Sequence, residues 1–206
     1  EGVCSTIENL KNAGIHIWML TGDKIETSLN IGIACNLIDN YSEQFLYIEN
    51  LVSNEDELMK KLDQDILTIE KSLKLPHYDF NKNASESNTK VFSKMNFCKN
   101  IFSRKKKNSF SLNLDNYKYL INSSNNVLVV DGTIIDILLS KKFVKKFVYL
   151  ADKCNSVICG RVSPYQKGAI VSSVSELLNK ITLAIGDGAN DRNMISRANI
   201  GVGIRG

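Results

Sequence analysis

The chain has little of several residue types that mark particular protein classes. Only 2 Pro and 12 Gly occur among its 206 residues, too few for a collagen-like chain or a Pro/Gly-rich disordered one. No window holds the roughly 18 continuous apolar residues that a membrane-spanning helix requires, and residues 1–20 lack a signal-peptide layout. With 43% hydrophobic and 23% charged residues, the composition fits one soluble domain, or one domain with a large insertion.

Disulfide-forming and metal-ligating residues are also scarce. Five cysteines, at positions 4, 35, 98, 154 and 159, form no Cys-x-x-Cys pair, and the histidines are His16 and His77 alone. An odd number of cysteines favours reduced thiols in the cytosol. Because the ligand spacing of a zinc site is absent, we expect packed or idle cysteines.

Positive charge is concentrated in one stretch. Residues 82–107 hold eight Lys or Arg and one acid, Glu86, whereas the whole chain carries a net charge of only +4. The sequence pI of 8.7 therefore reflects this stretch, and without a recognition motif it does not indicate nucleic-acid binding. The stretch lies within residues 76–116, whose Asn, Ser and Lys content and lack of periodicity predict a mobile insertion.

Elsewhere, short apolar runs alternate with amphipathic stretches. One helix is expected before residue 14, and the next shows Ile25, Leu29, Ile33 and Leu37 at the spacing of one continuous apolar face. The alternation predicts an α/β fold with a parallel sheet and helices on both faces. Strands are expected at 15–20, 44–49, 127–130, 156–159, 183–185 and 200–204, and further helices at 54–75, 133–150 and 164–178.

Polar clusters follow three of these strands: Thr21-Gly22-Asp23, the segment 161–167, and the segment 186–191. Because the carboxyl ends of parallel strands meet at one edge of a sheet, we expect the three clusters to gather there. In the first cluster, a hydroxyl and two backbone amides can hold phosphate oxygens. A capped helix start explains the same tripeptide nearly as well.

The other two clusters supply charge. Pro164 fits the first turn of a helix capped by Ser163, so Lys167 can reach back to the sheet edge and neutralise a phosphate; a solvated lysine is the alternative. Asp187 and Asp191 would repel each other without a cation, and oxygen ligands suit Mg²⁺, although a simple Asn/Asp/Gly turn is also conceivable. Together these groups suit phosphoryl transfer. Asp131 also follows a strand, but no activating neighbour identifies it as a nucleophile, and we interpret it as structural.

Three segments of the chain resemble motifs of the phosphorylation domain of P-type ATPases, and their residues are most similar to those of the P4 subfamily of phospholipid flippases. They are LTGDKIET at 20–27, ICGRVSPYQK at 158–167 and LAIGDGAND at 183–191. The resemblance covers residues 1–40 and about 125–206. It implies a Rossmann-like parallel sheet of the haloacid-dehalogenase type. The phosphorylation domain would then comprise residues 1–40 and 121–206, with a low-complexity insertion at 41–120.

The resemblance also implies roles for the clustered residues. Thr21 and Gly22 would contact the transferred phosphoryl group, assisted by Asn190, and Asp23 belongs to the same phosphate- and nucleotide-binding set. Lys167 would neutralise the phosphoryl group, and Arg161 would lie near the nucleotide ribose. Asp187 would ligate Mg²⁺, supported by Asp191.

In the intact pump, a phosphoaspartate forms from ATP and drives phospholipid from the outer to the cytosolic leaflet. The resemblance thus implies ATP and Mg²⁺ as cofactors, a phospholipid substrate held by membrane helices outside this chain, and an accessory beta subunit. The chain itself would lie on the cytosolic face of an integral membrane protein.

Two departures from the family pattern keep alternatives open. The nucleophile motif D-K-T-G-T is absent from the chain, so the fragment alone is predicted to be inactive, and its sheet is predicted to lack the nucleophile-bearing strand. Arg192 adds a positive charge beside the predicted Mg²⁺ site, which weakens metal binding if it acts there. The alternatives are a catalytically weakened module that regulates a fused or partner guanylate cyclase, and a haloacid-dehalogenase-type phosphatase.

Overall fold

The computed structural model describes residues 2–39, 41–49, 54–80 and 125–205. None of the helices in these ranges is long and apolar enough to cross a membrane. The strands are β1 (Ile17–Leu20), β2 (Glu43–Tyr47), β3 (Asn126–Asp131), β4 (Ser156–Gly160), β5 (Leu183–Gly186) and β6 (Ile200–Gly203). The helices are α1 (Val3–Asn12), α2 (Ile25–Ala34), α3 (Glu55–Ser72), α5 (Gly132–Leu138), α6 (Val144–Lys153), α7 (Pro164–Leu178) and α8 (Arg192–Arg197), with a short 3-10 turn at Ala189–Asp191.

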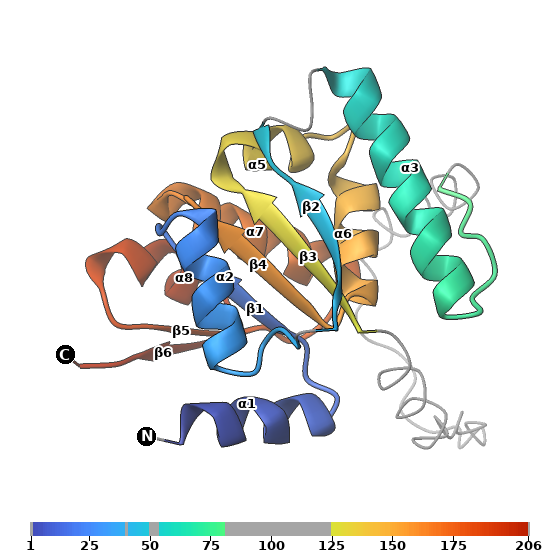
Figure 1. Ribbon diagram of the computed structural model, residues 1–206. Coiled ribbons are helices and arrows are strands. Elements are labelled where there is room, and N and C mark those ends of the chain that lie inside the picture. The colour runs from blue at the N-terminus through green and yellow to red at the C-terminus, as the bar shows by residue number, and fades with distance from the viewer. Residues whose placement is uncertain (1, 40, 50–53, 81–124, 206) are drawn as a thin grey trace, which may run out of the picture.

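A four-stranded parallel sheet in the order β1-β4-β3-β2 forms the centre of the molecule (Figure 1). The strands β5 and β6 pair in parallel as a separate two-stranded sheet. The predicted parallel α/β architecture is therefore confirmed. Within the described ranges, however, β5 is hydrogen-bonded to β6 and not to the central sheet, so the strand that precedes the third polar cluster stands apart.

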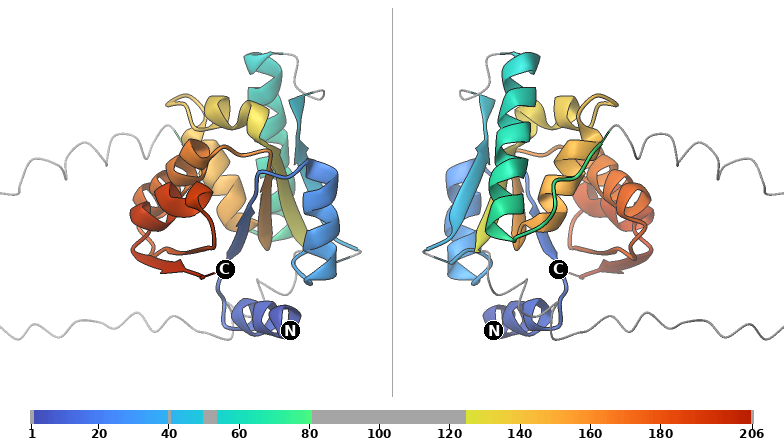
Figure 2. Two further views of the ribbon diagram at one scale, coloured as in Figure 1. Left: turned by 90° about the vertical axis from the view of Figure 1, so that its left-hand side faces the viewer. Right: turned by 90° about the vertical axis from the view of Figure 1, so that its right-hand side faces the viewer.

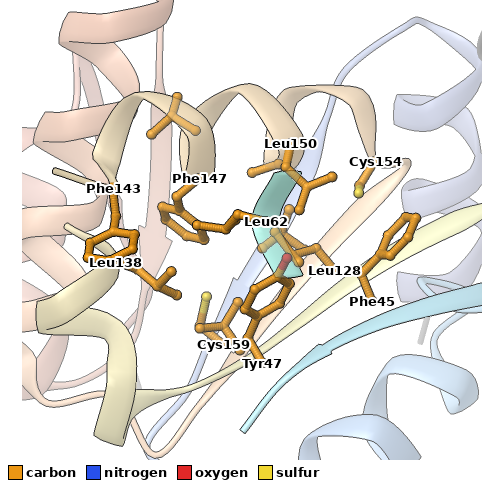
Figure 3. Close-up of a cluster of buried hydrophobic side chains, with 14 of the residues drawn as sticks. Phe45, Tyr47, Leu62, Leu128, Leu138, Phe143, Phe147, Leu150, Cys154 and Cys159 are labelled. Atoms are coloured by element: carbon orange, nitrogen blue, oxygen red, sulfur yellow. The ribbon is translucent and has the colours of Figure 1, made fainter. Parts of the chain in front are cut away.

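Helices cover both faces of the central sheet (Figure 2). On one face, Val127, Val129 and Ile158 pack in a cluster that includes Ile25 of α2. On the other face, the alternate strand residues pack against side chains from α3, α5, α6 and α7 (Figure 3). This alternation follows from the period of two along a strand, which sends successive side chains to opposite faces.

The apolar stripe predicted for α2 is wrong in detail. Ile33 is 42% exposed, and Ile25, Ser28 and Gly32 are the residues of this helix that are buried. The reason is close packing on β4, because a side chain at Gly32 would lie only 2.8 Å from Ile158 Cδ1. A small residue therefore faces the sheet, which hydrophobic periodicity does not register.

The helix predicted at 133–150 is two helices. The first, α5, ends at Leu138, and the second, α6, begins at Val144. Between them the carbonyl of Ser140 accepts hydrogen bonds from the N–H groups of Phe143 and Val144. This turn lets Leu138 and Phe143 both enter the core as fully buried side chains, which a single straight helix does not allow.

The interval expected as an insertion, 41–120, begins with elements of the core. Strand β2 pairs with β3 in the central sheet, and α3 contributes fully buried residues such as Leu62 and Ile69. The prediction of a mobile stretch from residue 76 is wrong at its start, because Tyr78 stacks on Tyr149 of α6 with ring centroids 4.8 Å apart. Residues 81–124, which hold the rest of that stretch, lie outside the described residues.

Two of the four cysteines that the structure describes are packed thiols, whereas Cys4 is exposed and Cys35 is partly buried. Cys154 and Cys159 are buried in the core and free, and burial raises the pKa of the Cys159 thiol to about 12. Cys98 lies outside the described ranges. The expectation of packed thiols is confirmed for these two residues.

Candidate functional site

The first two polar clusters meet at the carboxyl ends of β1 and β4. Backbone hydrogen bonds join them, from Val162 N–H to the Thr21 carbonyl at 3.0 Å and from Arg161 N–H to the Asp23 carbonyl at 2.7 Å. The Thr21 hydroxyl donates to Asp23 Oδ2 at 2.9 Å and accepts from Asp23 N–H at 3.1 Å. The loop is thus held in one shape, with Gly22 exposed at its tip.

Lys167 connects the second cluster to the third. Helix α7 begins with a capping box, in which Ser163 and Gln166 exchange backbone and side-chain hydrogen bonds. This start places Lys167 in the first turn, where its Nζ lies 2.8 Å from Asp191 Oδ1. Both residues are only 8% exposed, so Lys167 is not the solvated lysine that a lone residue at this position would suggest.

Asp191 is held from three directions. Burial works to raise the pKa of its carboxyl, but the hydrogen bond and charge of Lys167 outweigh burial and lower that pKa below its usual value. Its Oδ2 accepts from Gly188 N–H at 3.4 Å. A side chain at Gly186 would lie 2.3 Å from Asp191 Cβ, so only glycine at position 186 leaves room for this carboxylate.

Asp187 and Asn190 lie beside this pair and are exposed. Within the described ranges, no group of three or more His, Cys, Asp or Glu side chains is arranged to hold a metal ion. Asp187 follows β5 directly and presents an open carboxylate, whereas Asp191 is engaged by Lys167. Such a donor set fits Mg²⁺, which takes one or two protein carboxylates and completes its octahedron with phosphate oxygens and water.

Arg161 lies at the point where β1, β3 and β4 end. Its backbone has φ 55°, the left-handed region that non-glycine residues seldom occupy. Its Nη1 lies 3.4 Å from Asp131 Oδ2, and a side chain at Gly132 would lie 2.1 Å from its carbonyl oxygen. Asp131 and Gly132 thus pack directly against Arg161.

Sequence reasoning missed two of these connections. Asp131 was interpreted as structural, and its Oδ1 does cap α5 by accepting from Thr133 N–H at 3.0 Å, but its ion pair with Arg161 was not foreseen. Gln166 has no predicted role, yet its Nε2 donates to the Gly132 carbonyl at 2.9 Å. Both contacts join residues some 30 positions apart, so no local sequence pattern predicts them.

Comparison with known proteins identifies the group to which the chain is related. No family model matches it. Over the whole chain it is 38% identical to Phospholipid-transporting ATPase DNF1 of Chaetomium thermophilum and 36% identical to the protein of the same name in Saccharomyces cerevisiae. It is also 36% identical over its whole length to the human Probable phospholipid-transporting ATPase IM.

The chain spans 11%, 12% and 15% of the lengths of these three relatives. The similarity therefore concerns one part of much longer proteins, although it leaves no part of this chain uncovered. The chain is homologous, from end to end, to a segment of the P4-type phospholipid-transporting ATPases.

Proposed function

We propose that the chain is the phosphorylation-domain segment of a P4-type ATPase, which hydrolyses ATP through a phosphoaspartate and translocates phospholipid across a membrane. The observation that carries this proposal is the buried contact between Lys167 and Asp191, 2.8 Å apart. It joins two clusters that are otherwise remote in sequence, and the first of these is hydrogen-bonded to the Thr21 loop through Val162. A buried ammonium at the carboxyl edge of a parallel sheet suits the neutralisation of a transferred phosphoryl group.

The proposed roles follow from exposure and charge. Thr21, Gly22 and Asp23 form a rigid loop whose tip is open to a phosphate. Asp187 is the carboxylate available to Mg²⁺, with ATP supplying phosphate oxygens to the same ion. Asp191 supports that site by holding Lys167 in place, and Asn190 assists from the exposed turn.

We further propose that a strand carrying the D-K-T-G-T nucleophile lies between β1 and β5 in a complete haloacid-dehalogenase-type sheet. Among the described residues β1 pairs with β4 alone, and β5 with β6 alone. Leu183 and Ile185 of β5 are 56% and 51% exposed, which is unusual for a strand of an α/β sheet. An additional parallel strand would pair with both free edges. Without it the chain by itself is expected to be inactive.

The intact protein would accordingly be an integral membrane protein with this segment on its cytosolic face, acting on phospholipid and accompanied by an accessory beta subunit. One observation favours a second candidate, the weakened module that regulates a guanylate cyclase. Arg192 is exposed as the first residue of α8, directly after Asp191. Its positive charge disfavours a cation at the neighbouring carboxylates.

Formation of the phosphoenzyme tests the proposal. Full-length protein would be incubated with Mg²⁺ and ATP labelled in the γ-phosphate, and acid-stable label on the protein would be counted. We expect the wild type to be labelled and Asp187→Asn to lose the label. Asp152→Asn is the control, because it removes a carboxylate that belongs to none of the three polar clusters and that pairs with Lys153 and Lys180 before β4 begins.

The outcomes separate the candidates. Label on the wild type that is unchanged in Asp187→Asn would contradict the metal site. An unlabelled wild type would remove the pump mechanism and favour the regulatory module.

A further inference from the structure

We propose that Asp131 is a positioning residue that holds the Arg161 guanidinium in place for an anionic nucleotide at this edge of the sheet. The inference rests on the proposed function, and it assigns a role to a side chain that sequence reasoning treated as structural. It starts from the geometry of Asp131, whose two carboxylate oxygens have different partners.

The two carboxylate oxygens of Asp131 bind different groups. Oδ1 accepts from Thr133 N–H and caps α5. Oδ2 lies 3.4 Å from Arg161 Nη1. Asparagine caps helices as well as aspartate does, so the cap alone does not require a charge. A buried carboxylate is costly without a compensating partner, and Asp131 is 3% exposed. The ion pair with Arg161 accounts for the charge that the cap does not need.

Arg161 is fixed at its backbone as well. The left-handed conformation is unfavourable for a non-glycine residue and persists only where the surroundings impose it. Here the Arg161 N–H is bonded to the Asp23 carbonyl. Its own carbonyl is in contact with Gly132, where a Cβ would approach to 2.1 Å. The loops after β1 and β3 therefore set the direction in which the Arg161 side chain leaves the sheet.

The guanidinium keeps donors for a ligand. Arginine has five N–H donors in a planar fork, and Asp131 meets it at one nitrogen, at a distance of 3.4 Å rather than in a short two-pronged pair. The Arg161 side chain remains 45% exposed. Asp131 thus restricts the rotamers of a long side chain without covering it, which reduces the ordering cost when an anionic ligand binds.

The test compares Asp131→Asn, Arg161→Asn and the double variant in the full-length protein, by ATP hydrolysis over a range of ATP concentrations. Asparagine keeps the cap at position 131 and tolerates the left-handed backbone at position 161. We expect Asp131→Asn to raise KM for ATP about two- to fivefold, with a smaller change in kcat. The double variant should be no worse than Arg161→Asn. Asp152→Asn should leave both constants at the wild-type level.

Three results would overturn the proposal. One is an unchanged KM in Asp131→Asn while Arg161→Asn raises it, since Asp131 is then only a cap. Another is a double variant in which the two effects multiply, because the residues then act independently. The third is a rise in KM for Asp131→Asn while Arg161→Asn leaves KM unchanged, because Asp131 then does not act through Arg161. If Asp131→Asn does not accumulate, Asp131→Ser keeps a capping oxygen and removes the same charge. If the wild-type protein forms no phosphoenzyme, the proposed function is refuted. That result differs from the three above, which refute only the role of Asp131.

Discussion

The buried pair of Lys167 and Asp191 leads to the most quantitative prediction. Replacing Lys167 by Met removes the ammonium but keeps most of the side-chain volume, and leaves the Asp191 carboxylate 12% exposed without the partner at 2.8 Å. Breaking a buried pair in this way costs about 3–5 kcal/mol. Because the Gly188 N–H still bonds Asp191 Oδ2, we expect about 3 kcal/mol, the lower end of that range.

Urea unfolding of the 206-residue chain at pH 7 measures this loss. Trp18 in β1 is the chain's single tryptophan and packs against the main core, so its fluorescence reports the transition. The double variant Lys167→Met/Asp191→Asn has no buried charge at the site, and should be more stable than Lys167→Met. Lys180→Met is the matched control, since Lys180 pairs with Asp152 but is 48% exposed, and its loss should cost under about 1 kcal/mol.

The pH dependence gives a second signature. Burial works to raise the pKa of Asp191 in the folded protein, but Lys167 and the neighbouring backbone N–H groups lower it. The pair therefore stabilises the fold above the unfolded pKa of about 3.9, and this contribution is lost as the pH falls through the lower folded value. The difference between wild type and Lys167→Met should shrink in acid. A loss below about 0.5 kcal/mol at pH 7, or a difference that grows in acid, would refute the reasoning.

Three further predictions concern packing, a buried carboxylate and the insertion. Gly186→Ala should destabilise the chain by about 1–3 kcal/mol in the same unfolding assay, because the new Cβ would clash with Asp191. Gly203→Ala is the control and should be nearly neutral, because a Cβ at position 203 meets open space. Tyr149→Phe removes a hydrogen bond to Glu70 at 3.0 Å and should cost about 1.5 kcal/mol at pH 7, whereas the exposed Tyr165→Phe should cost nothing measurable. Burial works to raise the pKa of Glu70, but hydrogen bonds from His77, Tyr78 N–H and Tyr149 lower it. The destabilisation caused by Tyr149→Phe should therefore fade as the pH falls below about 4 and Glu70 becomes protonated. A destabilisation that persists at that pH would contradict this account. Deleting residues 82–116 from the full-length protein should preserve phosphoenzyme formation, and loss of label would show that this interval takes part in the cycle.

The sequence by itself determined the fold class, and it predicted which residues form a site. Apolar runs followed by polar clusters predicted the parallel sheet, and the structure joins the second and third clusters through Lys167 and Asp191. Such patterns can be read locally, because strand burial and helix caps depend on neighbouring residues. The capping box that begins at Ser163, for example, involves only the four consecutive positions 163–166.

Tertiary structure alone decided the contacts between distant segments. Gly32 faces the core in place of Ile33 because α2 lies close to β4. The pairing of Asp131 with Arg161 joins residues 30 positions apart at neighbouring strand ends. Local sequence carries no signal for these contacts. The first arises when α2 packs on β4, and the second when sheet order brings β3 beside β4 and sets the register of their carboxyl ends.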